Sequence, residues 1–291
     1  MRRPYTGSHD LRAMQSLVQR MWSPGSHWHV GDLAWGRRQH AGGEADRPTA
    51  LWRDRGGTVR AWGWAEPPCP PGSPAHLELL VDPAMPELAG QVLDWFAAVT
   101  VGPERTVTVA GEPHLTRALA EAGYRPRRDL PWFLLLHRDL ADLPPVPSRP
   151  RIRAVRDADV PARVDVHRAA FAPSMVTVDS YRRVRATWPY RPDLDLAVES
   201  PGGGFAAFCL AWFDPDLRVG ELEPVGTRPG QRRRGLATAA SLGALHALRA
   251  AGARGVVVHA RGDPGYPVPA LLYGGLGFAG VGRTATYSRT G

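Results

Sequence analysis

The residues best suited to chemistry in this chain lie close together between Glu221 and Ala240, in the sequence ELEPVGTRPGQRRRGLATAA. Glu221 and Glu223 stand two residues apart in a short apolar stretch, so their side chains would share one face of a strand. Carboxylates on such a face are able to take a proton from a substrate. A loop of Arg, Pro and Gly comes next, followed by an unbroken run of small residues typical of a helix. The segment therefore predicts a strand, a basic glycine loop and a helix, in that order.

This order favours the binding of an anion such as a phosphate. The first turn of a helix presents unpaired backbone N–H groups and the positive end of the helix dipole. Two common phosphate loops, G-x-x-x-x-G-K-[ST] and G-x-G-x-x-G, are not matched here. The motif that remains is Arg232-x-x-Gly235-x-Ala237. The alternative interpretation is that RPGQRRRG is only a solvated basic turn before a helix.

The motif, together with Val225-Gly226-Thr227, resembles the coenzyme A pyrophosphate signature of the GNAT N-acetyltransferase superfamily. In that fold the fourth and fifth strands splay apart at this point. Pro224 agrees with an unpaired edge, since a proline cannot donate to a sheet ladder. The resemblance implies that acetyl-CoA lies along this edge, with its pyrophosphate held by the backbone of residues 231–238. It implies these cofactor-binding residues: Val225, Gly226, Thr227, Arg232, Arg233, Arg234, Gly235, Leu236, Ala237 and Thr238.

The resemblance also implies catalytic roles. A carboxylate on this strand often serves as the base in the family. Glu221 matches the commoner placement and Glu223 is nearly as well placed, although each is equally compatible with a solvated strand residue. Tyr273, in Tyr273-x-x-x-Gly277-Phe278, resembles the tyrosine that commonly faces the thioester sulfur, and it would protonate the departing thiolate. The alternative for Tyr273 is a packed core residue, and the usual Asn after the fifth strand is missing, with Asp263 nearby instead.

Length and composition limit the number of domains and the kind of protein. The chain has 291 residues and 43% hydrophobic residues, enough for two domains with ordinary cores. It contains no Lys and no Asn, so all 36 basic residues are Arg, a bias that follows high-GC coding and suggests an actinobacterial type of source. The excess of positive charge lies in residues 141–291, which carry 20 Arg against 13 acidic residues. This is the half with the predicted phosphate loop.

Several classes of function are disfavoured. No recognition helix or aromatic-basic platform for nucleic acid is evident. No segment approaches the roughly 20 apolar residues of a membrane span, and no signal peptide follows the basic N-terminus. Cys69 and Cys209 have no metal-type spacing and are predicted to be free thiols in a reducing cytoplasm. We therefore expect a cytoplasmic protein without a metal, as a monomer or homodimer.

The first half of the chain predicts the same order of elements as the second. A helix over 10–22 capped by Asp10 is followed by strands near 28–35, 49–54, 58–65 and 76–81, then by helix 86–99, strand 105–110, helix 113–122 and strand 131–137. His27 and His29 would alternate along the first of these strands, either as half of a metal site or as solvent-facing side chains. The loop after strand 76–81 reads VDPAMPELAGQ, with no Arg and no suitably placed glycine. It predicts a degenerate repeat that keeps the fold without the cofactor.

A proline-rich linker at 141–150 separates residues 1–140 from residues 151–291. In the second half we expect strands near 151–156, 194–199, 205–212 and 255–260, and helices over 160–171, 177–187 and 236–250, with a short helix around Tyr273. The segment 188–192, sequence WPYRP, would either border the acceptor pocket or pack on the core.

Together these features predict an α/β protein of two tandem GNAT-like domains, each a mixed, mostly antiparallel sheet flanked by helices. The resemblance implies an N-acetyltransferase that moves an acetyl group from acetyl-CoA to a primary amine by direct attack in a ternary complex. The acceptor would be a small molecule or a peptide, with no nucleic acid and no membrane as partner. The alternative is a non-catalytic acyl-CoA-binding or regulatory protein of the same fold. The tandem arrangement resembles that of mycothiol synthase, and the acceptor does not carry over from that likeness.

Overall fold

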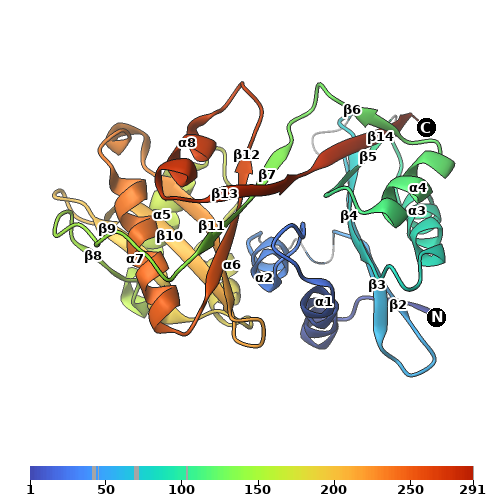
Figure 1. The fold of residues 1–291 in the computed structure, drawn as a ribbon, viewed down its shortest axis with the longest axis horizontal. Coiled ribbons are helices and arrows are strands. Elements are labelled where there is room, and N and C mark those ends of the chain that lie inside the picture. The colour runs from blue at the N-terminus through green and yellow to red at the C-terminus, as the bar shows by residue number, and fades with distance from the viewer. Residues whose placement is uncertain (41–43, 45, 69–71, 103, 291) are drawn as a thin grey trace.

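The computed structural model describes the chain except for residues 41–43, 45, 69–71, 103 and 291, so the prediction for Cys69 lies outside the described residues. Two sheets of seven strands stand side by side, with helices between them and on their outer faces (Figure 1). Both mixed sheets and their flanking helices agree with the predicted α/β class.

Most helices and strands of the first half lie where the sequence predicted them. They are β1 (Arg2–Pro4), α1 (Ser8–Met21), α2 (Val30–Arg38), β2 (Thr49–Arg53), β3 (Val59–Glu66), β4 (Ala75–Val81), α3 (Glu87–Val99), β5 (Glu104–Val109), α4 (Pro113–Glu121), β6 (Arg125–Arg127) and β7 (Phe133–Asp139).

The second half repeats this pattern. Its elements are β8 (Ile152–Ala154), α5 (Val160–Ala170), α6 (Val178–Arg185), β9 (Asp195–Glu199), β10 (Phe205–Asp214), β11 (Val219–Thr227), α7 (Leu236–Ala250), β12 (Gly255–Arg261), α8 (Val268–Gly275), β13 (Ala279–Arg283) and β14 (Ala285–Thr290).

The strand orders of the two sheets show the internal repeat directly. The first sheet runs β1-β2-β3-β4-β5-β14-β6, and the second, read from its other edge, runs β8-β9-β10-β11-β12-β7-β13. In each sheet the fourth and fifth strands are parallel and pair over only three residues. Both halves of the chain therefore have one topology.

The sixth place in each sheet is filled from the other half of the chain. β14, from the C-terminus, pairs with β5 and β6, while β7 pairs with β12 and β13 (Figure 1). The sheets consequently do not divide the chain at the expected boundary of 141–150, since residues 133–139 belong to the second sheet and residues 285–290 to the first. The hydrophobic pattern of β7 and β14 does not reveal this exchange, because it is equally compatible with pairing inside the strand's own half of the chain.

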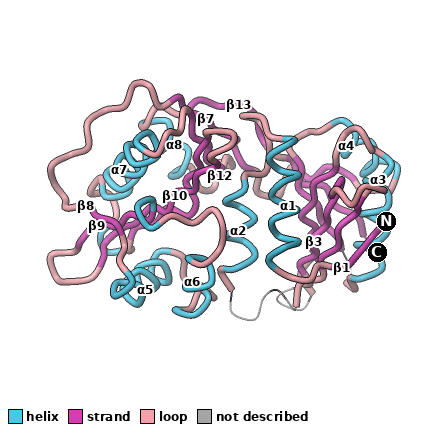
Figure 2. The backbone as a smooth tube through the Cα atoms, turned by 90° about the horizontal axis from the view of Figure 1, so that it is seen from below, coloured by secondary structure: helices cyan, strands magenta, loops and turns pink. Residues whose placement is uncertain are grey.

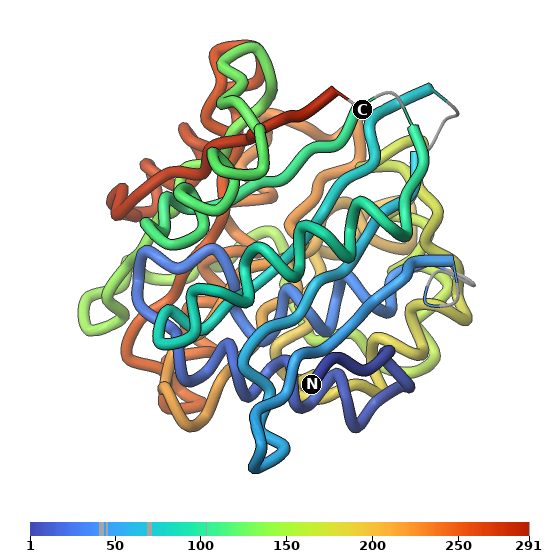
Figure 3. The backbone as a smooth tube through the Cα atoms, turned by 90° about the vertical axis from the view of Figure 1, so that its right-hand side faces the viewer, coloured from blue at the N-terminus to red at the C-terminus, as the bar shows by residue number. Residues whose placement is uncertain are grey.

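Helices α1 and α2 lie between the two sheets (Figure 2). α1 packs on β3 with Met14, Leu17 and Trp62 in one core. α2 contacts β10 and β11 of the second sheet, and its Ala34 and Trp35 share a core with Trp212 of β10. α3 crosses the outer face of the first sheet (Figure 3), over a core that includes Val92 and Phe96. The two halves thus share one helical layer.

Two local predictions are wrong. Residues 28–35 were expected as a strand, but α2 begins at Val30, because His29 caps it: the Gly31 N–H donates to His29 Nδ1 (3.1 Å) and the His29 N–H donates to Asp32 Oδ2 (2.7 Å). Alternation of apolar residues over so short a run does not distinguish a strand from a helix. Asp10 is not the cap of α1 but lies in its first turn, behind Gly7.

None of the helices in the described part of the chain combines the length and apolar character that a bilayer crossing requires.

Candidate active site

Strand β11 leaves its parallel neighbour at the predicted site. Its pairing with β12 covers Val219 to Glu221 and stops there, while its pairing with β10 continues to Thr227 across an irregularity opposite Leu210. Pro224 lies within this irregularity, as the lack of an N–H predicts. On the β12 side, the backbone of residues 222–227 therefore has no strand partner. An edge of this kind is able to pair with an extended amide-bearing ligand.

The loop between β11 and α7 has the backbone of an anion-binding turn. Gly235, which precedes α7, has a left-handed backbone conformation with φ 71°. Arg233 has the same conformation, with φ 62°. A Cβ added at Gly235 would meet no atom within 4 Å, so this glycine faces open space. Arg232 ties the loop to the end of α5 by donating from Nη2 to the carbonyl oxygen of Ala170 (3.2 Å). The loop and the first turn of α7 together offer N–H groups to an anion.

A cavity of about 480 Å³ adjoins this loop. It reaches from the loop along the free edge of β11 to α8, where Tyr273 lines it, and to Tyr266 in the segment just before α8. All the predicted cofactor-binding residues except Arg234 line it: Val225, Gly226, Thr227, Arg232, Arg233, Gly235, Leu236, Ala237 and Thr238. The volume is in the range of small-molecule and cofactor sites.

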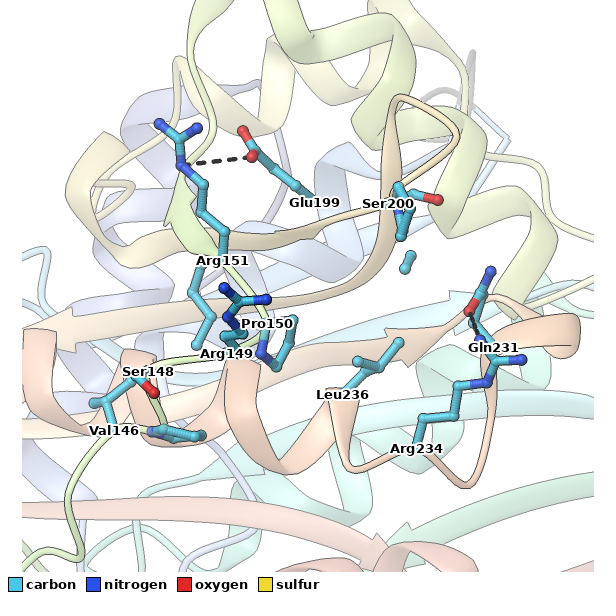
Figure 4. A pocket seen from close by; sticks show the side chains of 14 residues that line it. Val146, Ser148, Arg149, Pro150, Arg151, Glu199, Ser200, Gln231, Arg234 and Leu236 are labelled. Atoms are coloured by element: carbon cyan, nitrogen blue, oxygen red, sulfur yellow. Dashed lines mark hydrogen bonds and ion pairs between the residues drawn. The ribbon is translucent and has the colours of Figure 1, made fainter.

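Arg234 points to a neighbouring surface pocket (Figure 4). It donates to Oε1 of Gln231 (2.9 Å), and both residues line this pocket opposite the linker residues Val146 to Arg151. Leu236 borders both this pocket and the 480 Å³ cavity. The structure thus separates Arg234 from the other two arginines of the loop.

Tyr273 packs in the core of the second sheet and also lines the 480 Å³ cavity. Its side chain is 6% exposed and packs edge-on against Phe278 at 5.5 Å between ring centroids. Burial raises the pKa of its hydroxyl well above the ordinary value, and nearby Cys209 and Glu223 raise the pKa further. The phenol is therefore protonated at neutral pH and able to donate. Cys209 is a free, buried thiol, as predicted, and burial raises its pKa.

Glu221 and Glu223 point to the same side of β11, and both line a second cavity. Glu221 is 1% exposed, and its Oε2 lies 3.1 Å from Nδ1 of His29. Glu223 is partly exposed. Burial raises the pKa of each carboxyl to about 8, and the charge of Asp32 adds to the effect at Glu223. A carboxylate with such a pKa is a competent base near neutral pH.

Asp32, from α2 in the other half of the chain, completes this group and was not predicted. Side-chain ligand atoms of Asp32, Glu221 and His259 all lie within 4.8 Å of one another. Burial and the charge of Glu221 raise the pKa of Asp32 well above its ordinary value. Burial lowers the pKa of His259. The spacing of these three residues is compatible with a metal ion as well as with an organic cation.

Gly31 explains how α2 comes so close to β11. A Cβ at this position would lie 2.3 Å from Cγ of Trp212 and 2.6 Å from Oε2 of Glu221. No sequence pattern singled out Asp32 or His259, because they lie far from Glu221 along the chain. The sequence did single out His29, which lies next to Glu221 in the fold. It was expected on a strand, however, whereas it caps α2.

The second cavity, of about 420 Å³, lies between the two halves of the chain. β11 and β12 form one wall with Glu221, Glu223 and His259. β3 and β4 contribute Trp64, Glu66 and Glu78, and α2 contributes Asp32, Trp35 and Gly36. The other lining residues are His27, Trp28, Gln39, His40, Arg47 and Phe133. On β11, Glu223 lines this cavity and Val225, two residues on, lines the 480 Å³ cavity. The two cavities therefore approach each other along a single strand.

Residues 188–192 pack on the core and do not line this cavity. The hydroxyl of Tyr190 donates to Oδ2 of Asp195 (3.1 Å), and its ring contacts Trp212. The carbonyl oxygen of Trp188 accepts a hydrogen bond from Gln15 (3.0 Å). Of the two interpretations of this segment, the packed loop agrees with the structure.

No family model matches the chain. No curated protein sequence matches it either. Solved structures do match in fold. A GCN5-related N-acetyltransferase from Sphaerobacter thermophilus superposes with a TM-score of 0.64 at 18% identity, over 100% of this chain and 95% of that one. A tandem GNAT protein from the clavulanic acid biosynthesis pathway gives 0.66 at 17% identity, over 100% and 98%.

The chain has the tandem GNAT fold. N-myristoyltransferase of Saccharomyces cerevisiae, solved with bound myristoyl-CoA, also matches, with a TM-score of 0.58 at 12% identity over 100% of this chain and 78% of that one. The tandem arrangement accounts for the repeated strand order of the two sheets.

Proposed function

We propose that the protein is an N-acetyltransferase that transfers an acetyl group from acetyl-CoA to a primary amine of a small-molecule or peptide acceptor. The observation that carries this proposal is the approach of the two cavities along β11. Glu223 belongs to the cavity with the carboxyl groups, and Val225 belongs to the cavity beside the anion-binding loop. An amine in the first would lie next to a thioester in the second.

The loop and α7 fit the phosphate end of acetyl-CoA. Gly235 leaves open space at the helix N-terminus, and Arg232 and Arg233 place positive charge on the same cavity. The free edge of β11 at residues 222–227 would pair with the amide groups of the pantetheine arm. Bound in this way, acetyl-CoA supplies the activated acyl group.

Glu223 is the better candidate for the base. It is partly exposed to the cavity, whereas Glu221 is 1% exposed and in contact with His29. In our proposal Glu223 accepts a proton from the acceptor's ammonium group. The freed amine attacks the thioester carbonyl, so that a C–N bond forms and the C–S bond breaks. Tyr273 donates its proton to the departing sulfur and regains a proton from the nitrogen, which loses it as the amide forms.

The decisive experiment is an acetylation assay with acetyl-CoA and a panel of primary amines, aminoacyl compounds and N-terminal peptides. The rate should increase with pH through about 8, because only the ionised Glu223 accepts a proton. Glu223→Gln should lower kcat by about 10²–10⁴-fold, with partial recovery at high pH where hydroxide deprotonates the amine.

Glu221→Gln should have the smaller effect, and Glu121→Gln, at an exposed position at the end of α4, is the control. Normal turnover in both single variants and in the double variant would exclude the strand carboxylates from the mechanism. Tight binding of acetyl-CoA with no acetylated product from any amine would favour the non-catalytic alternative.

A further inference from the structure

The proposed function leaves the acceptor undefined, and we infer from the 420 Å³ cavity that it is a small dication, such as a diamine. This inference rests on the proposed function for the fate of the bound amine. One cationic group would bind the carboxyl groups of Asp32, Glu221 and Glu223, and the other would bind Glu78 on the opposite wall. The acceptor would thus be held by both halves of the chain.

Unpaired carboxylate oxygens lie on both walls of the cavity. Among the described residues, Oε1 of Glu221 is buried and has no hydrogen-bond partner, and the same is true of Oε2 of Glu78. Glu221 lies on β11 of the second sheet and Glu78 on β4 of the first. A buried carboxyl oxygen without a hydrogen-bond donor is destabilising. A ligand with a donor at each end would satisfy both oxygens.

The charges of the lining residues are unbalanced. The described residues that line the cavity include five carboxyl groups, those of Asp32, Glu66, Glu78, Glu221 and Glu223, and one guanidinium, that of Arg47. Arg47 lies 3.5 Å from Glu66, and Glu78 lies 3.3 Å from His76, which is outside the lining. Among the described residues that line the cavity, none supplies a cationic partner to the carboxyl groups of Asp32, Glu221 and Glu223. A cationic ligand would supply the missing charge.

The histidines of the cavity do not supply that charge. Burial lowers the pKa of His27, His40 and His259, so these rings are neutral at pH 7. By contrast, burial alone would raise the pKa of Glu78, but the charge and hydrogen bond of His76 outweigh it, so that the pKa is lowered and this carboxylate is ionised. The wall formed by β4 therefore holds an ionised carboxylate, of which Oε1 faces His76 and Oε2 has no hydrogen-bond partner.

Three tryptophans, Trp28, Trp35 and Trp64, also line the cavity. Trp64 lies opposite Glu78 in the β3–β4 ladder. Aromatic faces attract organic cations, and the attraction is stronger where the contact excludes water. Rings and carboxylates together favour an alkylammonium over an inorganic ion. The limited volume favours a small molecule over a protein segment.

The test is binding without acetyl-CoA, so that it is independent of acyl transfer. Calorimetry on the full chain would compare α,ω-diaminoalkanes of increasing length with n-alkylamines of the same lengths. We expect the best diamine to bind at least about tenfold more tightly than its matched monoamine, the scale of one charged hydrogen bond. Glu78→Gln should remove this preference, and Glu121→Gln should retain it. Asp32→Asn should weaken both ligands.

Equal affinities of diamines and monoamines, no binding of either, or a preference that survives in Glu78→Gln would overturn the inference. So would a stoichiometric metal in the purified protein that Asp32→Asn and His259→Gln release, because the cation of the site would then be that metal. Diamines that bind as expected and yet are not acetylated would support the cation site and count against the proposed function alone.

Discussion

At the scale of single residues, Gly235 and Tyr273 shape the 480 Å³ cavity that both of them line. Gly235 has φ 71° and open space where a side chain would be. Tyr273 is 6% exposed, so that its ring is fixed by the core while its position on α8 borders the cavity. Both the core interpretation and the site interpretation of Tyr273 therefore agree with its position. Substitutions at these two residues separate ligand binding from catalysis.

Gly235→Asp should weaken acetyl-CoA binding by about 1–3 kcal/mol, or about 5–150-fold, because the carboxylate would occupy the space proposed for the pyrophosphate. Calorimetry measures the change. Gly57→Asp is the matched control, since Gly57 has φ 81°, also faces open space, and lies in the β2–β3 turn of the other sheet. The two variants suffer a similar backbone strain, so equal affinities for acetyl-CoA would show that the cofactor binds elsewhere.

Tyr273→Phe should lower kcat by up to about 10²–10⁴-fold while the Kd for acetyl-CoA changes little, because in our proposal the hydroxyl acts only on the departing sulfur. Tyr266→Phe is the control, since Tyr266 lines the same cavity and is 44% exposed. Single-turnover kinetics separates the chemical step from binding. A variant at Tyr273 with unchanged turnover would leave this residue a purely structural role.

At the scale of the element, the carboxyl groups of β11 set stability against function. The pairing of β11 with β12 ends at Glu221, and its two carboxyl groups line one cavity together with a third from α2. Their pKa values are raised by burial, which means that the fold opposes their ionisation. Sites that hold like charges together commonly reduce stability in this way.

The conflict predicts a pH-dependent gain of stability in Glu223→Gln. The pKa of Glu223 is about 8 in the fold and near 4.5 in the unfolded chain, so between these values the unfolded state releases a proton that the folded state keeps. Stability contributed by this group is present below pH about 4.5 and is lost as the pH rises to about 8. Thermal unfolding should show Glu223→Gln more stable than the parent at pH 9, with a smaller difference at pH 5. An equal shift at both pH values would mean that the carboxyl is not the cause.

At the scale of the whole molecule, the two halves share a topology but not a phosphate loop. After β4 the chain places Asp82, which is 3% exposed, where the second half has its basic loop. Asp82 accepts hydrogen bonds from the N–H of Ala84 and from Arg60, both at 2.9 Å. A carboxylate already occupies the local donors, and its charge would repel a phosphate.

We therefore expect one acetyl-CoA per chain. Calorimetry on the intact protein should give a stoichiometry near one, and Gly235→Asp should weaken that single site. The intact chain is required because β7 and β14 are exchanged between the sheets, so halves cut at 141–150 would each lack a strand. A second equivalent of acetyl-CoA, still bound by Gly235→Asp, would place a working site in the first half.

The sequence by itself determined most of the elements and the place of the basic glycine loop before α7. Hydrophobic period, caps and glycine positions are local properties, and they located α7 and the bounds of most strands to within a few residues. The free edge of β11 followed from Pro224 and from the resemblance. The error at α2 arose because His29 caps a helix through its side chain, which an alternating pattern does not reveal.

Only the tertiary structure decided the partners of these elements. The exchange of β7 and β14 depends on which sheet each strand reaches, and both choices satisfy the same local pattern. The carboxyl group of Asp32 joins Glu221 because Gly31 allows α2 to lie against β11, a contact between residues that are far apart along the chain. The raised pKa values follow from that burial, since desolvation and neighbouring charge are properties of the assembled fold rather than of the residue.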